Sequence, residues 1–125
     1  MATVDLTKDT FESVVTGNGM VIVDFWAPWC GPCKGFAPVF EQASELHGDV
    51  VFAKVNTEDE QEIAGAFGIR SIPTLMVFRE KVVLFQRAGA LPASALEQVI
   101  TQSRALDMAQ VHKEIAERGD AGPQG

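Results

Sequence analysis

The run of seven residues at positions 20–26, Met-Val-Ile-Val-Asp-Phe-Trp, constrains the fold of this chain more than any other stretch. Its residues favour a β-strand, and apolar side chains fall on both of its faces, with only Asp24 interrupting them. Such a run is typical of a central strand that is covered by helices on both sides. A helical period begins soon afterwards, so residues 27–33, which contain both cysteines of the chain, are predicted to connect this strand to a helix.

Four further segments are predicted to be strands, at residues 3–6, 50–55, 75–78 and 82–85. Only Arg79, Glu80 and Lys81 separate the last two, which predicts an antiparallel hairpin. Strands that alternate with helices and then end in a hairpin indicate an α/β fold. We therefore expect a central mixed sheet of four to five strands, with helices on both faces.

Helical spacing of apolar residues predicts helices between and after these strands. The helix that follows the cysteines is expected to kink at Pro38 and to bury one apolar face, made of Phe36, Val39, Phe40, Ala43 and Leu46. Thr57 and Glu60 have the spacing of a capping box for the next helix. Pro92 fits the first turn of a later helix that carries Leu96, Val99 and Ile100 inward.

This later helix loses its apolar phase at Ser103, and a further short helix is predicted beyond it. Asp107 and Gln110 have the spacing to cap that helix, which would use Met108 and other apolar residues on its inner face. Residues 119–125 have the composition of a disordered tail.

Charge and hydropathy narrow the range of functions. The chain of 125 residues has a formal net charge of −7 and no cluster of lysine or arginine, which argues against nucleic-acid binding. The longest apolar run, at residues 20–23, is too short to span a bilayer, and the chain opens without the pattern of a signal peptide. We therefore expect a soluble cytoplasmic protein, in which a close pair of cysteines has a redox or metal-binding role.

A disulfide between Cys30 and Cys33 would add little to the stability of the fold, because the loop that it closes is very small. If Cys33 lies in the first turn of the helix, Cys30 lies just before it, where free N–H groups and the helix dipole favour a thiolate. Gly31 allows a tight turn and Pro32 fixes it. We predict that Cys30 is an exposed nucleophile and that Cys33 is a buried resolving thiol.

Asp24 has two interpretations that its position in the sequence leaves open. A buried carboxylate would have a raised pKa and would accept a proton from Cys33 near neutral pH. Alternatively, Asp24 is a residue at the end of a strand that faces water.

A metal site is the less favoured role for the cysteines. A structural zinc ion needs about four ligands, whereas the chain has one Cys-x-x-Cys pair and two isolated histidines, His47 and His112. We therefore predict no metal ligand.

The segment Trp-Ala-Pro-Trp-Cys-Gly-Pro-Cys-Lys at residues 26–34 resembles the active-site signature of the thioredoxin family. Other segments resemble that family in the same order along the chain: residues 23–25, Pro38, and residues 54–56, 68–74 and 89–91. The resemblance covers residues 3–103. It implies a thioredoxin domain at residues 1–103, followed by a helical extension at residues 104–118.

The resemblance implies a role for each matching residue. Cys30 would attack a substrate disulfide and Cys33 would resolve the mixed disulfide, while Asp24 and Lys54 assist proton movement. Pro73 would be cis, although a trans proline is the commoner state on sequence alone. The Ile72 backbone would pair with the substrate chain as an added strand.

Other matching residues would bind substrate or support the site. Trp29, Gly89 and Ala90 would line a flat apolar surface around Cys30, together with Gly31 and Pro32. Trp26 would pack below the loop, which agrees with the usual place of tryptophan in a core, and Pro38 would give structural support. Lys54 is otherwise an ordinary strand lysine that reaches solvent.

The sequence also departs from the family pattern. The hairpin turn Arg-Glu-Lys at residues 79–81 has no glycine, so it is expected to be strained or differently shaped. Gly35 stands where a larger side chain is usual, and residues 104–125 extend beyond the minimal domain.

The implied activity is that of a protein-disulfide reductase, an electron carrier in cell redox homeostasis. Its implied partners are oxidised client proteins and a thioredoxin reductase that supplies electrons from NADPH through a flavin. The protein itself would bind no cofactor and would be a monomer. The alternative is a thioredoxin-like holdase or complex subunit with little redox turnover, but Cys30, Cys33 and Asp24 would then have no chemical purpose.

Overall fold

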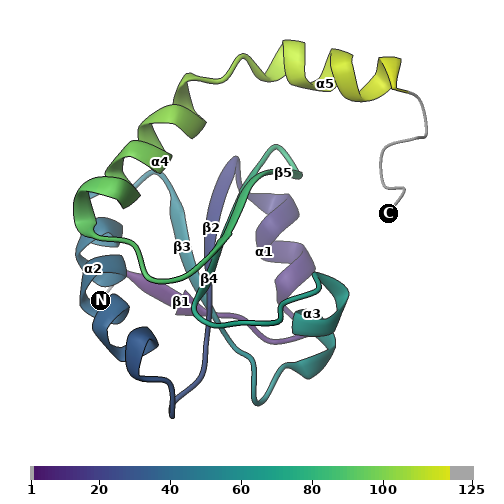
Figure 1. The fold of residues 1–125 in the computed structure, drawn as a ribbon. Helices are drawn as coiled ribbons and strands as arrows, with labels where there is room; N and C mark the ends of the chain where they lie inside the picture. Colours follow the sequence, from purple (N-terminus) through teal and green to yellow (C-terminus); the bar gives the residue numbers. More distant parts are fainter. Residues whose placement is uncertain (1, 119–125) are drawn as a thin grey trace.

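The central strand β2 (Met20–Trp26) organises a five-stranded sheet in the computed structural model, which describes residues 2–118 (Figure 1). The other strands are β1 (Thr3–Asp5), β3 (Val51–Asn56), β4 (Thr74–Arg79) and β5 (Val82–Ala88), and the strand order is β1-β3-β2-β4-β5. β3 runs parallel to β1 and β2, whereas β4 is antiparallel to β2 and β5. The predicted α/β class, mixed sheet and hairpin are therefore confirmed.

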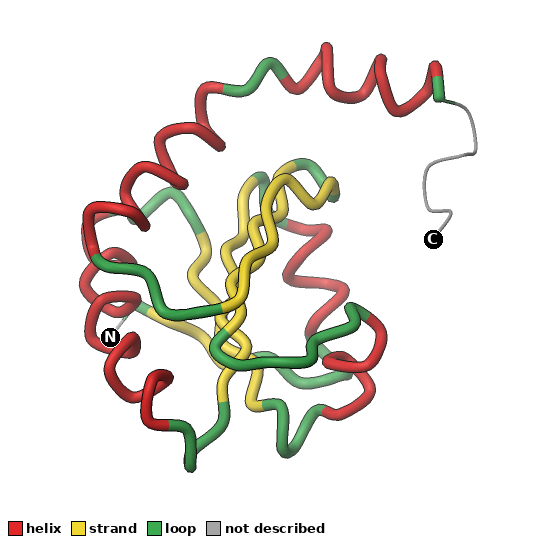
Figure 2. The backbone as a smooth tube through the Cα atoms, viewed as in Figure 1, coloured by secondary structure: helices red, strands yellow, loops and turns green. Residues whose placement is uncertain are grey.

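Helices cover both faces of this sheet, as Figure 2 shows. The covering helices are α1 (Phe11–Gly17), α2 (Gly31–Leu46), α3 (Gln61–Ala66) and α4 (Ala93–Ala105), whereas α5 (Met108–Glu117) extends beyond the end of the sheet. Buried residues of α2 and α4 share one core cluster, and those of α1 and α3 share another.

Alternation along β2 explains why its apolar run is continuous. Ile22 packs in the cluster with α2 and α4, while Val21 and Val23 pack in the cluster with α1 and α3. Because side chains alternate between the two faces of a strand, Asp24 lies on the same face as Ile22, beneath α2. The Asp24 side chain therefore points toward α2, the helix that begins at the cysteines.

Three predictions about helices differ from the structure. The capping box is absent, since the Thr57 hydroxyl donates to the Trp26 carbonyl and the Glu60 carboxylate accepts from the Lys8 N–H. Leu46 is 68% exposed, because α2 ends there and the last turn extends past the core. Pro92 precedes α4 as its N-cap residue and so lies one position before the predicted first turn.

A residue of the sheet holds the C-terminal end of α4 in place. Arg79, the last residue of β4, donates from Nη1 to the carbonyls of Ser103, Arg104 and Leu106 at 2.8, 3.1 and 3.0 Å. α5 then begins after Asp107, whose carboxylate accepts from the Gln110 N–H at 3.2 Å, as predicted. The predicted disordered tail lies outside the described residues.

The turn between β4 and β5 has the strain that its composition indicated. Glu80 and Lys81 have φ values of 52° and 71°, in the left-handed region that favours glycine. The departure from the family pattern at this hairpin therefore has a local energetic cost.

Candidate active site

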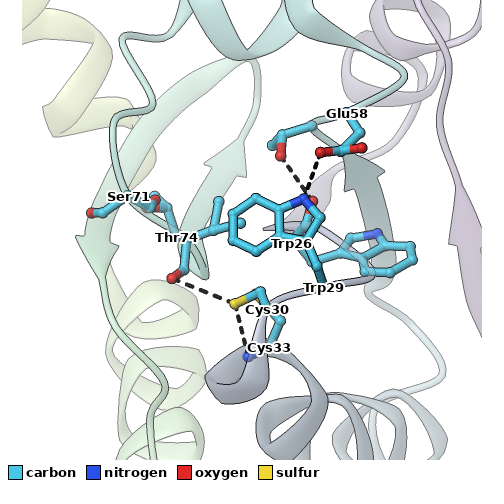
Figure 3. Close-up of a disulfide and its surroundings, with 9 residues drawn as sticks. Trp26, Trp29, Cys30, Cys33, Glu58, Ser71 and Thr74 are labelled. Atoms are coloured by element: carbon cyan, nitrogen blue, oxygen red, sulfur yellow. Dashed lines mark hydrogen bonds between the residues drawn. A yellow bond between two sulfur atoms is a disulfide. The ribbon is translucent and has the colours of Figure 1, made fainter.

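The two cysteines form a disulfide at the beginning of α2, with their Cα atoms 5.2 Å apart (Figure 3). Cys30 is the N-cap residue, and its Sγ accepts a hydrogen bond from the Cys33 N–H at 3.2 Å. Gly31 and Pro32 fill the first two positions of the helix. A sulfur at this position receives both an N–H donor and the positive end of the helix dipole, which stabilise a thiolate.

The predicted exposure of Cys30 is wrong for this disulfide state. Cys30 is 5% exposed and Cys33 is 3% exposed, so burial hardly distinguishes the attacker from the resolver. Ala27, Trp26 and Ile72 pack in one cluster with the two cysteines. The difference between the two cysteines lies instead in their positions on the helix, since only Cys30 is the N-cap residue.

A remote loop completes the site. The Ile72–Pro73 peptide bond is cis, as the resemblance implies, and the Ile72 carbonyl oxygen lies 3.8 Å from the Cys30 Sγ. Gly89 donates from its N–H to the Pro73 carbonyl at 2.7 Å, and Ala90 follows at the surface. The fold therefore brings together three of the predicted segments.

Asp24 is buried, so the water-facing interpretation is wrong. The residue is 1% exposed, and neither carboxylate oxygen has a hydrogen-bond partner among residues 2–118. Burial raises the pKa of Asp24 to about 7, and the nearby Lys54 charge opposes this rise only in part. Asp24 is thus able to exchange a proton near neutral pH.

Lys54 lies near this carboxylate, and Trp26 lies near Lys54. Lys54 is the register partner of Asp24 across β2 and β3, and its Nζ lies 4.7 Å from the centroid of the Trp26 ring. Trp26 also packs against the cysteines, as expected for a supporting residue. Pro38 lies inside α2, on its exposed side and five residues after Cys33, and its supporting role stays a prediction.

Trp29 is the exposed aromatic residue of the site, at 65% exposure. Its Nε1 donates to the Glu58 carboxylate, a contact that sequence reasoning missed (Figure 3). Thr57 was missed as well, and both its N–H and its hydroxyl donate to the Trp26 carbonyl. Because β2 and β3 are parallel neighbours, the residues after each strand meet at one edge of the sheet, and this is the signal that could have identified them.

Neither a cluster of metal ligands nor a membrane-crossing helix occurs within residues 2–118. Within residues 2–118, no three metal-ligating side chains gather in a way that could hold a metal ion. In the same part of the chain, no helix has both the length and the apolar character needed to cross a membrane.

Comparison with known proteins identifies the family. The sequence model described as thioredoxin matches residues 2–102. The chain belongs to the thioredoxin family. A putative thioredoxin 2 of Streptomyces coelicolor is 56% identical over 94% of this chain and 87% of its own length, and the thioredoxin of Bacillus subtilis is 42% identical over 82% and 98%. The solved structure of Plasmodium falciparum thioredoxin superposes with a TM-score of 0.74 at 36% identity, covering 80% of this chain and 97% of that one.

Family membership and the dithiol together define the chemistry. A thioredoxin-family protein with Cys30 and Cys33 at disulfide distance is a thiol–disulfide oxidoreductase, and it belongs with the protein-disulfide reductases. The holdase alternative is not favoured.

Proposed function

We propose that this protein reduces exposed disulfides of client proteins through a mixed disulfide with Cys30. The observation that carries this proposal is the N-cap position of the Cys30 sulfur, next to the Ile72 carbonyl. In the first step, the Cys30 thiolate attacks one client sulfur and the client disulfide breaks. The second client sulfur leaves as a thiolate and takes a proton from solvent.

Cys33 completes the reaction. Its thiol loses a proton and attacks the Cys30 sulfur, so the Cys30–Cys33 disulfide forms and the first client sulfur leaves as a thiolate. The two electrons of the protein dithiol have then passed to the client. Asp24 supports this step, since a buried carboxyl with a pKa near 7 accepts the Cys33 proton at neutral pH, and Lys54 modulates its charge.

The client chain would bind across the end of the sheet. Pairing of an extended client with the Ile72 backbone gives affinity without requiring a particular sequence. Trp29, Gly31, Pro32, Gly89 and Ala90 are all exposed at this end, where they offer a surface around the cysteines.

Recharging would require a separate protein. A thioredoxin reductase would pass two electrons from NADPH, through its flavin and its own dithiol, to the Cys30–Cys33 disulfide. The protein would then bind no cofactor and act as a monomeric electron carrier in cytoplasmic redox homeostasis. The likeness to bacterial thioredoxins supports this proposal.

A coupled assay tests the function. NADPH consumption is followed with a thioredoxin reductase and a disulfide substrate, for the intact protein and for Cys30→Ser. We expect turnover with the intact protein and none with the variant. Absence of dithiol-dependent turnover would contradict the reductase proposal.

A trapping experiment tests the intermediate. In Cys33→Ser the mixed disulfide has no resolving thiol, so client proteins should remain attached through Cys30 and be released by dithiothreitol. Cys30→Ser is the matched control and should retain none. Protein recovered from a cell extract without bound clients would contradict the mechanism.

A further inference from the structure

Thr57 donates twice to one carbonyl at the beginning of the loop that carries the cysteines. Its N–H and its hydroxyl lie 2.8 and 3.0 Å from the Trp26 carbonyl oxygen. The first of these bonds continues the ladder between β2 and β3, in which Trp26 pairs with Asn56. The second bond is an addition that depends on the side chain of Thr57.

The β4 side of Trp26 offers no such contact from a backbone N–H. The register between β2 and β4 ends at Phe25 and Thr74, one residue before Trp26. The residue that precedes Thr74 is Pro73, which has no N–H to donate. The neighbouring strand β3 therefore holds the backbone of β2 where it passes into the loop.

Thr57 belongs to a turn that is itself well hydrogen-bonded. The Asn56 carbonyl accepts from the N–H groups of Asp59 and Glu60 at 3.1 and 2.9 Å. The Asn56 side-chain oxygen accepts from the Glu58 N–H at 2.9 Å. This turn therefore presents the Thr57 hydroxyl in a fixed position.

The Trp26 ring has no polar anchor of its own. Its Nε1 is buried and has no hydrogen-bond partner within residues 2–118. The ring contacts Lys54, whose Nζ lies 4.7 Å from its centroid, and it packs in the cluster that contains Cys30 and Cys33. A shift of the Trp26 backbone would therefore change the packing around both sulfurs.

The two sulfurs must stay side by side for Cys33 to attack Cys30. Groups that are held in a productive arrangement react as if they were at a much higher concentration, and a small displacement reduces this advantage. Contacts that keep the two cysteines together therefore speed the closing of the disulfide and also favour the disulfide over the open dithiol.

We propose that the Thr57 hydroxyl positions the dithiol: by fixing the Trp26 carbonyl, it keeps the Trp26 ring packed with the cysteines, lowers the reduction potential of their disulfide and speeds client release. This proposal rests on the reductase function proposed above and adds a positioning residue to it. Thr57 acts through Trp26 and takes no part in the bond-making steps.

Four variants are compared with the intact chain. Thr57→Val and Thr57→Ala remove the hydroxyl but keep the backbone N–H bond to Trp26, and Thr57→Ala adds no new methyl group if Thr57→Val folds poorly. Thr57→Ser retains a hydroxyl and should behave as the intact chain does. Thr16→Val is the matched control, because the Thr16 hydroxyl donates to the Glu12 carbonyl at 2.8 Å in α1, at an exposed position.

The redox equilibrium is the first measurement, and it needs neither a client nor a reductase. Each protein is equilibrated with mixtures of reduced and oxidised dithiothreitol, and its free thiols are counted after alkylation. In this exchange the protein disulfide accepts two electrons and two protons from the reagent dithiol, which closes to its own disulfide. For Thr57→Val and Thr57→Ala we expect an equilibrium constant for reduction that is about two- to tenfold larger, which is a potential about 9 to 30 mV higher.

The rate of client release is the second measurement. Each protein is reduced, mixed with a neutral disulfide peptide and quenched with acid, and the mixed disulfide is separated and measured. Release should be about two- to tenfold slower in Thr57→Val and Thr57→Ala. The initial attack should change little, because the Cys33 N–H and the helix dipole that stabilise the Cys30 thiolate are unaltered.

Two results would overturn the proposal. One is a potential or a release rate that is the same in Thr57→Val and Thr57→Ala as in the intact chain. The other is an equal change in Thr57→Ser or Thr16→Val, which would show that the effect does not come from the Thr57 hydroxyl. If the intact chain formed no mixed disulfide with the peptide, the reductase function itself would fail, whereas the redox equilibrium would still test Thr57.

Discussion

Asp24 and Lys54 are direct register partners in β2 and β3, yet the Asp24 carboxylate has no hydrogen-bond partner among residues 2–118. The Lys54 ammonium lies over the Trp26 ring instead, with its Nζ 4.7 Å from the ring centroid. Burial therefore dominates the ionisation of Asp24 and raises its pKa from 3.8 to about 7. This raised pKa has consequences for both stability and rate.

The first prediction concerns stability against pH. Because the folded pKa of Asp24 exceeds the unfolded value, the native state binds more protons than the unfolded state between about pH 4 and pH 7, and stability falls as pH rises through this window. Between pH 5 and pH 8 the loss is about 3 kcal/mol. Asp24→Asn removes this loss of stability. The difference in free energy of unfolding between Asp24→Asn and the intact protein, measured with urea, should therefore be about 3 kcal/mol larger at pH 8 than at pH 5.

Asp5→Asn is the matched control for this measurement. It removes the same charge from exposed β1, and its effect at each pH sets the baseline for Asp24→Asn. An advantage of Asp24→Asn that is the same at both pH values would contradict a raised pKa in the folded state.

The second prediction concerns the resolving step. If Asp24 accepts the Cys33 proton as proposed, Asp24→Asn removes that acceptor, and release of the client from the mixed disulfide should slow roughly ten- to a hundredfold at pH 7. Rapid acid quenching of a single turnover, followed by separation of the mixed disulfide, measures this step. Asp24→Asn should leave the initial attack by Cys30 much less affected, and equal release rates in the two proteins would exclude the proton-accepting role.

The third prediction concerns Trp29. Glu58→Ala removes the acceptor of the Trp29 indole N–H, so the exposed ring should become more mobile. We expect the KM for a neutral disulfide substrate to rise about two- to fivefold with little change in kcat. Glu62→Ala removes an equal charge from the first turn of α3 and should leave KM unchanged. A similar KM for Glu58→Ala and the intact protein would show that this contact does not position Trp29 for binding.

The fourth prediction concerns the hairpin turn. Lys81 has a φ of 71°, so Lys81→Gly relieves left-handed strain and should raise the free energy of unfolding by about 1 kcal/mol. Lys113→Gly, inside α5, should instead lower it by about 1 kcal/mol, because glycine is a weak helix former. Urea titration at neutral pH distinguishes the two signs, and a loss of stability in Lys81→Gly would refute the strain at this turn.

Local patterns predicted the elements that deliver the cysteines. The apolar run of β2, the helical period after Cys33 and the spacing of Asp107 and Gln110 all depend on neighbours in sequence, and the structure confirms each of them. The capping box failed because Thr57 and Glu60 found hydrogen-bond partners on other elements. A local rule has no information about such competing contacts.

The sequence by itself determined the dithiol, its place at the beginning of a helix and, through the thioredoxin resemblance, the cis bond at Pro73. Only the tertiary structure decided that Asp24 is buried, that Cys30 is covered, and that Glu58 holds Trp29. The physical reason is one of distance along the chain. Helix starts and strand faces are set by residues a few positions apart, whereas burial and side-chain contacts depend on strand order and register, which join residues far apart in sequence.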